Sequence, residues 1–303
     1  MRGNRPRFVL ASLLVLSVAS LCAQDPIFRS ATRLVVLHAT VTNKHGDLVT
    51  NLDASAFSVF ENGKRQPVSL FRRDDVPVSI GLLIDNSGSM RSLRTRVEAA
   101  ALAFARASNP QDEMFVLNFA DKTRIDVEMT GDLKVLERGI ARADSIGGTA
   151  LRDAIETAEG YLRDHAKQDR RVLLVITDGI DNSSTTTAAA IQRTAEQTQT
   201  VIDAIGLFHA QDPGRAGQGR KELHELTERT GGIVSFPESV DQVESVAVDL
   251  ARRIRSQYTL GYAPTIQALD GSYRSIRVTA IGPEGYTVKT RPGYRAVPEI
   301  KSK

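Results

Sequence analysis

The chain has 303 residues, of which 41% are hydrophobic and 25% are charged, and this composition is typical of a globular protein rather than a disordered one. Its formal net charge of +3 comes from three arginines near the start, since without them the 39 basic residues fall by three and match the 36 acidic ones. A balanced charge gives no indication of a nucleic-acid partner or of an anionic membrane surface.

Residues 1–23 have the parts of a secretory signal peptide. Arg2, Arg5 and Arg7 precede the apolar run Phe8–Leu21, and small residues follow it. This run is short for a membrane-spanning helix, although an uncleaved anchor is the alternative. The only cysteine, Cys22, would leave with the leader, so the mature chain would have no disulfide. We therefore expect a secreted or periplasmic protein with no membrane span after signal cleavage.

The N-terminal flank, residues 24–76, has a β pattern. Apolar and polar residues alternate over Arg33–Thr42, which predicts a half-buried strand. Phe57–Phe60 and Pro67–Phe71 are two more short runs. The Asn62-Gly63 pair between them predicts a hairpin, because both residues accept a positive φ.

Strand and helix patterns alternate through residues 77–256. This succession predicts a doubly wound, mostly parallel sheet with helices on both faces. The loop Gln211–Arg220 is expected to be flexible, because its glycines do not have the spacing of a phosphate-binding turn. The expected strands are Ile80–Ile84, Met114–Phe119, Val172–Thr177, Val201–Leu207 and Ile233–Phe236, and the expected helices lie at Arg94–Ser108, Leu133–Ile140, Leu151–Leu162, Thr187–Thr198, Lys221–Thr230 and Val243–Ile254.

The C-terminal flank, residues 257–303, returns to β. Its expected strands are Tyr258–Tyr262, Tyr273–Ala280 and Tyr286–Thr290. Neither flank alone has enough strands for a stable core. We therefore expect the two flanks to pair in one small β-sandwich, with the α/β domain inserted between them.

A cluster of side-chain oxygens follows the first strand of the α/β region. The apolar run ends at Asp85, and Ser87 and Ser89 follow at alternate positions, with the turn formers Asn86 and Gly88 between them. Open α/β sheets bind their ligands at the carboxyl ends of strands. Oxygen ligands of this kind suit magnesium. The alternative is that a serine only caps the next helix.

Two later motifs carry matching residues. Gly147-Gly148-Thr149 precedes the third expected helix, and Thr177-Asp178-Gly179 ends the most hydrophobic strand. The series D-x-S-x-S, G-G-T and T-D-G resembles the metal-ion-dependent adhesion site of von Willebrand factor type A domains. The resemblance covers about Val78–Ser256, and the flanks resemble those of secreted bacterial proteins that carry this domain. It implies that Mg²⁺ or Mn²⁺ is bound by Asp85, Ser87, Ser89, Thr149 and Asp178.

The ligand chemistry predicts a function in binding. Two carboxylates and three hydroxyls only just neutralise a divalent ion. If Asp178 acts through water, as the resemblance implies, the ion stays electron-poor and can accept an Asp or Glu carboxylate from a protein partner. We therefore expect an adhesion or scaffold module without catalytic residues.

Two alternatives to this function stay open. One is a structural module with an idle metal site. The other is a metal-dependent hydrolase, which the five scattered histidines make less favourable because none belongs to a recognisable catalytic motif.

Overall fold

The computed structural model describes residues 33–73, 75–141, 146–208, 213–282 and 285–298. The predicted signal peptide, residues 1–23, lies outside these ranges and stays a prediction. No helix among the described residues has both the length and the apolar character needed to cross a bilayer.

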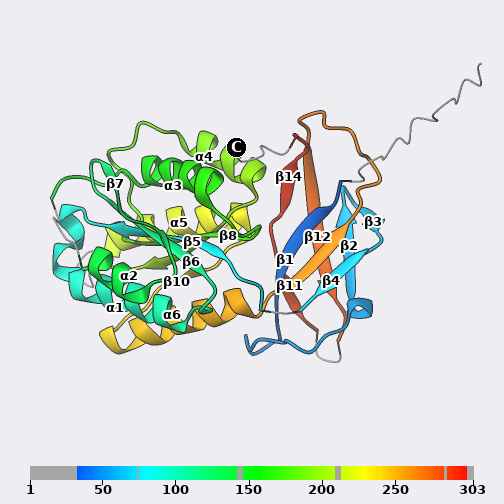
Figure 1. Ribbon diagram of the computed structural model, residues 1–303, viewed down its shortest axis with the longest axis horizontal. Coiled ribbons are helices and arrows are strands. Elements are labelled where there is room, and N and C mark those ends of the chain that lie inside the picture. Colours follow the sequence, from blue (N-terminus) through cyan, green and yellow to red (C-terminus); the bar gives the residue numbers. More distant parts are fainter. Residues whose placement is uncertain (1–32, 74, 142–145, 209–212, 283–284, 299–303) are drawn as a thin grey trace, which may run out of the picture. The chain divides into compact units, whose positions relative to one another are not determined.

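Within the described residues, six strands form one sheet at the centre of the α/β part (Figure 1). From one edge to the other they are β10 (Val234–Ser235), β9 (Val201–Gly206), β8 (Arg171–Thr177), β5 (Ser79–Asp85), β6 (Glu113–Phe119) and β7 (Thr123–Thr130). Neighbouring strands from β10 to β6 are parallel, and β7 pairs antiparallel with β6. The predicted doubly wound, mostly parallel sheet is therefore confirmed.

Helices cover both faces of this sheet, as the successive strand and helix patterns predicted. On one face, Ile80, Leu82 and Ile84 of β5 pack with α1 (Arg94–Ala107), α2 (Leu133–Ile140) and α6 (Val240–Arg255). On the other face, Leu83 belongs to a cluster with α3 (Leu151–His165), α4 (Ala188–Thr198) and α5 (Pro213–Thr230). Because successive side chains of a strand point to opposite faces, one apolar strand supplies both cores.

The two flanks form two further sheets, each with strands from both ends of the chain. The first has the order β13-β1-β11-β4 and the second β14-β12-β2-β3. Apolar residues of both sheets share one core cluster, which confirms the predicted pairing of the flanks. The exact domain limits stay a prediction. The strands are β1 (Val35–Thr42), β2 (Phe57–Glu61), β3 (Lys64–Gln66), β4 (Leu70–Arg72), β11 (Tyr258–Tyr262), β12 (Tyr273–Ala280), β13 (Thr287–Lys289) and β14 (Gly293–Arg295).

The structure corrects one predicted strand of the N-terminal flank. Asn62 and Gly63 do form the hairpin turn, both with positive φ. The returning strand is β3 directly after the turn, whereas the expected strand Pro67–Phe71 was wrong. Part of that segment forms β4, which pairs with β11 in the other sheet, because Pro67 cannot donate a ladder hydrogen bond and the chain changes sheets after it.

The structure also corrects the expected loop Gln211–Arg220. Residues 213–220 are the first two turns of α5, which begins at Pro213. Proline suits the first helical position because its missing N–H is not needed there. Gly219 has a packing role in this helix, since a Cβ on it would lie 2.1 Å from the backbone oxygen of Asp178. This close approach brings α5 against the loop that carries a predicted site residue.

Candidate metal site

Asp85 lies at the carboxyl end of β5 and is fully buried. Its Oδ1 accepts a hydrogen bond from the backbone N–H of Ser87 at 2.8 Å, and its Oδ2 accepts one from the Thr177 hydroxyl at 2.5 Å. Burial, together with a smaller effect of the nearby Asp178 charge, raises the pKa of Asp85 to about 6 despite these bonds. An ionised Asp85 is therefore costly unless a cation lies beside it.

Ser87 and Ser89 lie on the same turn, and their hydroxyl oxygens are 3.1 Å apart. Ser87 precedes the 3₁₀ helix η2 (Gly88–Leu93), but its side chain makes no capping hydrogen bond, and the residue that precedes α1 is Leu93. Ser87 is therefore not a capping residue for either helix, which counts against the alternative that it only caps the next helix.

Thr149 lies on the glycine loop before α3. The N–H of Gly88 donates to the carbonyl oxygen of Gly147 at 3.0 Å, which joins this loop to the Asp85 turn. The Thr149 side chain is buried, and its Oγ1 has no hydrogen-bond partner among the described residues. A buried hydroxyl without a partner is rare in folded proteins, so this atom calls for an explanation.

Asp178 follows β8 and is also buried. Its Oδ2 lies 3.3 Å from Nη2 of Arg215, which comes from the first turn of α5. The Asp178 charge acts on Asp85 across the site. The loop after Asp178 is tied to the glycine loop, because Asn182 accepts a hydrogen bond from the Thr149 N–H at 2.8 Å and donates its own N–H to the Thr149 carbonyl at 3.0 Å.

The structure thus brings together the three loops that carry the five predicted donors. Contacts tie the Asp85 turn to both other loops, through Gly147 and through Thr177. Among the described residues, no three His, Cys, Asp or Glu side chains gather in a group that could hold a metal. The candidate site instead combines two carboxylates with three hydroxyls.

Two residues of the site were missed by sequence reasoning. Arg215 was assigned to a flexible loop, so its contact with Asp178 was not foreseen. Asp121 follows β6, and its Oδ1 accepts the Gly148 N–H at 2.7 Å and lies 3.2 Å from the Ser183 hydroxyl. A carboxylate just after a parallel strand was the signal for Asp121, whereas no sequence signal pointed to Arg215.

A comparison with protein-family models matches residues 80–181 to the von Willebrand factor type A domain. The matched range includes all five candidate donors and the central strands β5, β6 and β8. The chain carries a von Willebrand factor type A domain. Domains of this type typically mediate protein–protein interaction and adhesion. A search of curated proteins found no match.

Solved structures share the fold at low sequence identity. A von Willebrand factor type A protein from Catenulispora acidiphila is 14% identical with a TM-score of 0.50, covering 89% of this chain and 75% of that one. This coverage exceeds the type A domain and includes flanking strands. Proximal thread matrix protein 1 from the mussel byssus, solved with a zinc-occupied MIDAS motif, is 17% identical with a TM-score of 0.50, covering 64% of this chain and 49% of that one. This chain therefore matches about half of that protein. BatB from Bacteroides thetaiotaomicron is 16% identical with a TM-score of 0.47, covering 59% of this chain and 100% of that one.

Proposed function

We propose that the type A domain binds a divalent cation, Mg²⁺ or Mn²⁺, through Asp85, Ser87, Ser89, Thr149 and Asp178, and that the bound ion recognises a carboxylate of a protein partner. The observation that carries this proposal is the buried Thr149 Oγ1, which has no hydrogen-bond partner among the described residues. A metal ion at this position would supply the missing partner.

The residues present fit such an ion. Two buried carboxylates that repel each other, with hydroxyls beside them, are a donor set that a hard divalent cation would neutralise. Thr177 and the Ser87 N–H hold the Asp85 carboxylate in one orientation, and this lowers the cost of assembling the site. The ion would supply an electron-poor centre for an outside oxygen ligand.

The type of partner follows from the charge balance. Two carboxylates leave no excess negative charge on a divalent ion, so an added anionic ligand is favoured. An Asp or Glu side chain of another protein supplies that charge. On the basis of the predicted signal peptide, we propose that this binding takes place outside the cytoplasm, in a secreted or periplasmic protein.

Capture of a partner from the native extracellular fraction tests this function. We expect the wild-type chain to retain a partner in Mg²⁺ and to lose it in chelator. Asp85→Ala should lose the same partner while keeping its circular dichroism spectrum. A matched control is Asp249→Ala, which changes an exposed acidic residue of α6. A partner that stays bound in chelator or on Asp85→Ala would instead support the structural module with an idle metal site.

A further inference from the structure

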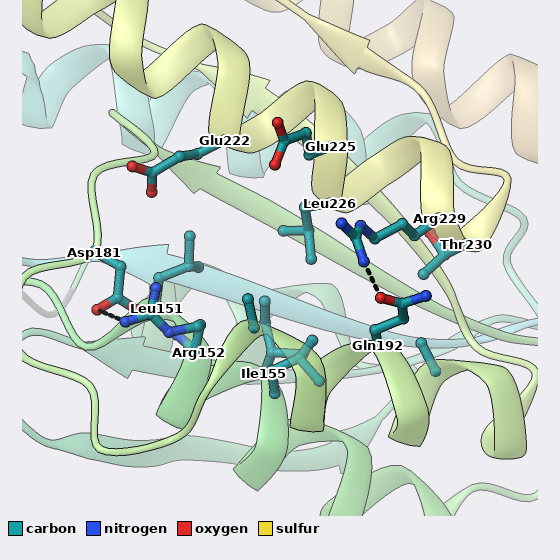
Figure 2. Close-up of a pocket in the computed structure, with 13 residues that line it drawn as sticks. Leu151, Arg152, Ile155, Asp181, Gln192, Glu222, Glu225, Leu226, Arg229 and Thr230 are labelled. Atoms are coloured by element: carbon teal, nitrogen blue, oxygen red, sulfur yellow. Dashed lines mark hydrogen bonds and ion pairs between the residues drawn. The ribbon is translucent and has the colours of Figure 1, made fainter.

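A cavity of about 270 Å³ lies between α3, α4 and α5 (Figure 2). None of the five proposed metal ligands lines it. Its walls are mainly apolar, with Leu151 and Ile155 from α3, Ile191 from α4 and Leu226 from α5. Figure 2 shows α5 on one side of this space, facing the other two helices across it.

The two arginines at the cavity are already engaged. Nη2 of Arg152 lies 3.1 Å from Asp181, and its Nε donates to the carbonyl oxygen of Thr186 at 2.7 Å. Arg229 donates a hydrogen bond to the side-chain oxygen of Gln192 at the opposite end. Asp181 therefore compensates the charge of Arg152, and Arg229 lies at the opposite end of the cavity from Glu222.

Two carboxylates on α5 remain at the cavity. Glu222 accepts a hydrogen bond from the Gln218 amide at 2.8 Å, and Glu225 makes no hydrogen bond or ion pair with a described residue. Figure 2 shows both side chains on the α5 side of the cavity. A ligand with an apolar body and one positive charge would complement this arrangement.

The volume limits the size of that ligand. A cavity of about 150 Å³ with apolar walls is enough to bind benzene. The space here therefore admits one aromatic ring with a short chain. We propose that this cavity is a binding site for a small arylalkyl amine, with the ring against Leu151, Ile155 and Ile191 and the ammonium group at Glu225 and Glu222. Binding at this site needs no metal, so a test of this site does not depend on whether the proposed function is correct.

Calorimetric titration of the full chain tests the ligand class. The probes are 3-phenylpropylamine, 3-phenyl-1-propanol and 3-phenylpropionate, which share one body and differ in charge. We expect the amine to bind about three- to tenfold more tightly than the alcohol, and the acid to bind most weakly. No binding of the amine at millimolar concentration, or an acid that binds as well as the amine, would overturn the proposal.

Two pairs of variants locate the site. Ala188 lines the cavity and is exposed, so Ala188→Trp should fill the mouth and abolish amine binding, whereas Ala189→Trp on the next exposed residue should leave it unchanged. Glu225→Gln should weaken amine binding about three- to tenfold but leave alcohol binding unchanged. Glu228→Gln, on the same helix outside the cavity, is its control. Equal binding to Ala188→Trp and Ala189→Trp would place the amine elsewhere and refute the site.

Discussion

At the scale of single residues, Arg215 is a basic residue in contact with a proposed metal ligand. It lies 3.3 Å from Asp178 and so neutralises a carboxylate that the ion would share. Because a guanidinium close to a divalent cation repels it, Arg215→Gln should tighten Mg²⁺ binding about three- to tenfold in a calorimetric titration.

The control for this prediction comes from the same helix. Arg229→Gln makes the same charge change at the other end of α5, where the side chain contacts Gln192. It should leave Mg²⁺ affinity unchanged. Weaker Mg²⁺ binding in Arg215→Gln would mean that the arginine holds Asp178 in its ligating orientation and does not compete with the ion.

At the scale of elements, the packing of α5 can be tested with two of its glycines. Gly219 has no room for a side chain, because its Cβ would lie 2.1 Å from the Asp178 carbonyl oxygen. A Cβ added to Gly217, in contrast, would have no atom within 4 Å. Gly219→Ala should therefore lower the free energy of unfolding by about 1–3 kcal/mol. Gly217→Ala should raise it by about 0.5–1 kcal/mol, because alanine favours helix. Urea unfolding measures both, and two shifts of the same sign would contradict the packing described for α5.

The start of α5 is also an example of a helix boundary that the sequence pattern did not predict. The strands Tyr258–Tyr262 and Tyr273–Ala280 were predicted with their exact bounds, because apolar residues recur at every second position along them. The start of α5 was missed because three glycines lower the helix propensity of residues 213–220, whereas in the structure this segment packs closely against the Asp178 loop. β7 was missed although Ile125, Val127 and Met129 alternate with charged residues.

The candidate site was predictable to a similar extent. The five donors follow strand ends or a glycine loop, so their order in the chain was enough to bring them to one edge of the sheet. Arg215 contacts Asp178 at this edge from the first turn of α5. The sequence analysis expected a loop at this position, so the contact was not predicted. That the Thr149 hydroxyl finds no hydrogen-bond partner among the residues described depends on side-chain packing, which the sequence does not reveal.

At the scale of the whole molecule, one buried ionic cluster joins the two flanks. Glu61 of β2 accepts hydrogen bonds from the hydroxyls of Tyr262 and Tyr294, at 2.6 and 2.9 Å. Arg274 of β12 is also buried, with its Nη1 3.6 Å from Glu61. Removing the Glu61 charge leaves the buried arginine with the half-exposed Asp270, 3.4 Å from its Nη2, as its remaining carboxylate partner. Glu61→Gln should therefore lower the free energy of unfolding by about 1–3 kcal/mol.

A surface ion pair provides the control for Glu61. Glu137 pairs with the exposed Arg106 at 2.7 Å, and Glu137→Gln should change the free energy of unfolding by less than about 1 kcal/mol. Urea unfolding of both variants gives the comparison. Equal small losses would show that the flanks do not depend on the buried cluster.

The proposed metal site is tested most directly by calorimetric titration of Mg²⁺ into the wild-type chain and into Thr149→Val. Because the Thr149 hydroxyl has no hydrogen-bond partner in the part of the chain that the structure describes, its replacement by a methyl group should keep or raise the metal-free stability, by up to about 1 kcal/mol. Thr227→Val, which removes a buried hydroxyl that donates to the carbonyl oxygen of His224 far from the site, is the control. We predict that the wild type and Thr227→Val bind Mg²⁺ and that Thr149→Val binds it at least tenfold more weakly. Equal Mg²⁺ affinity in all three proteins, or none in the wild type, would contradict the account.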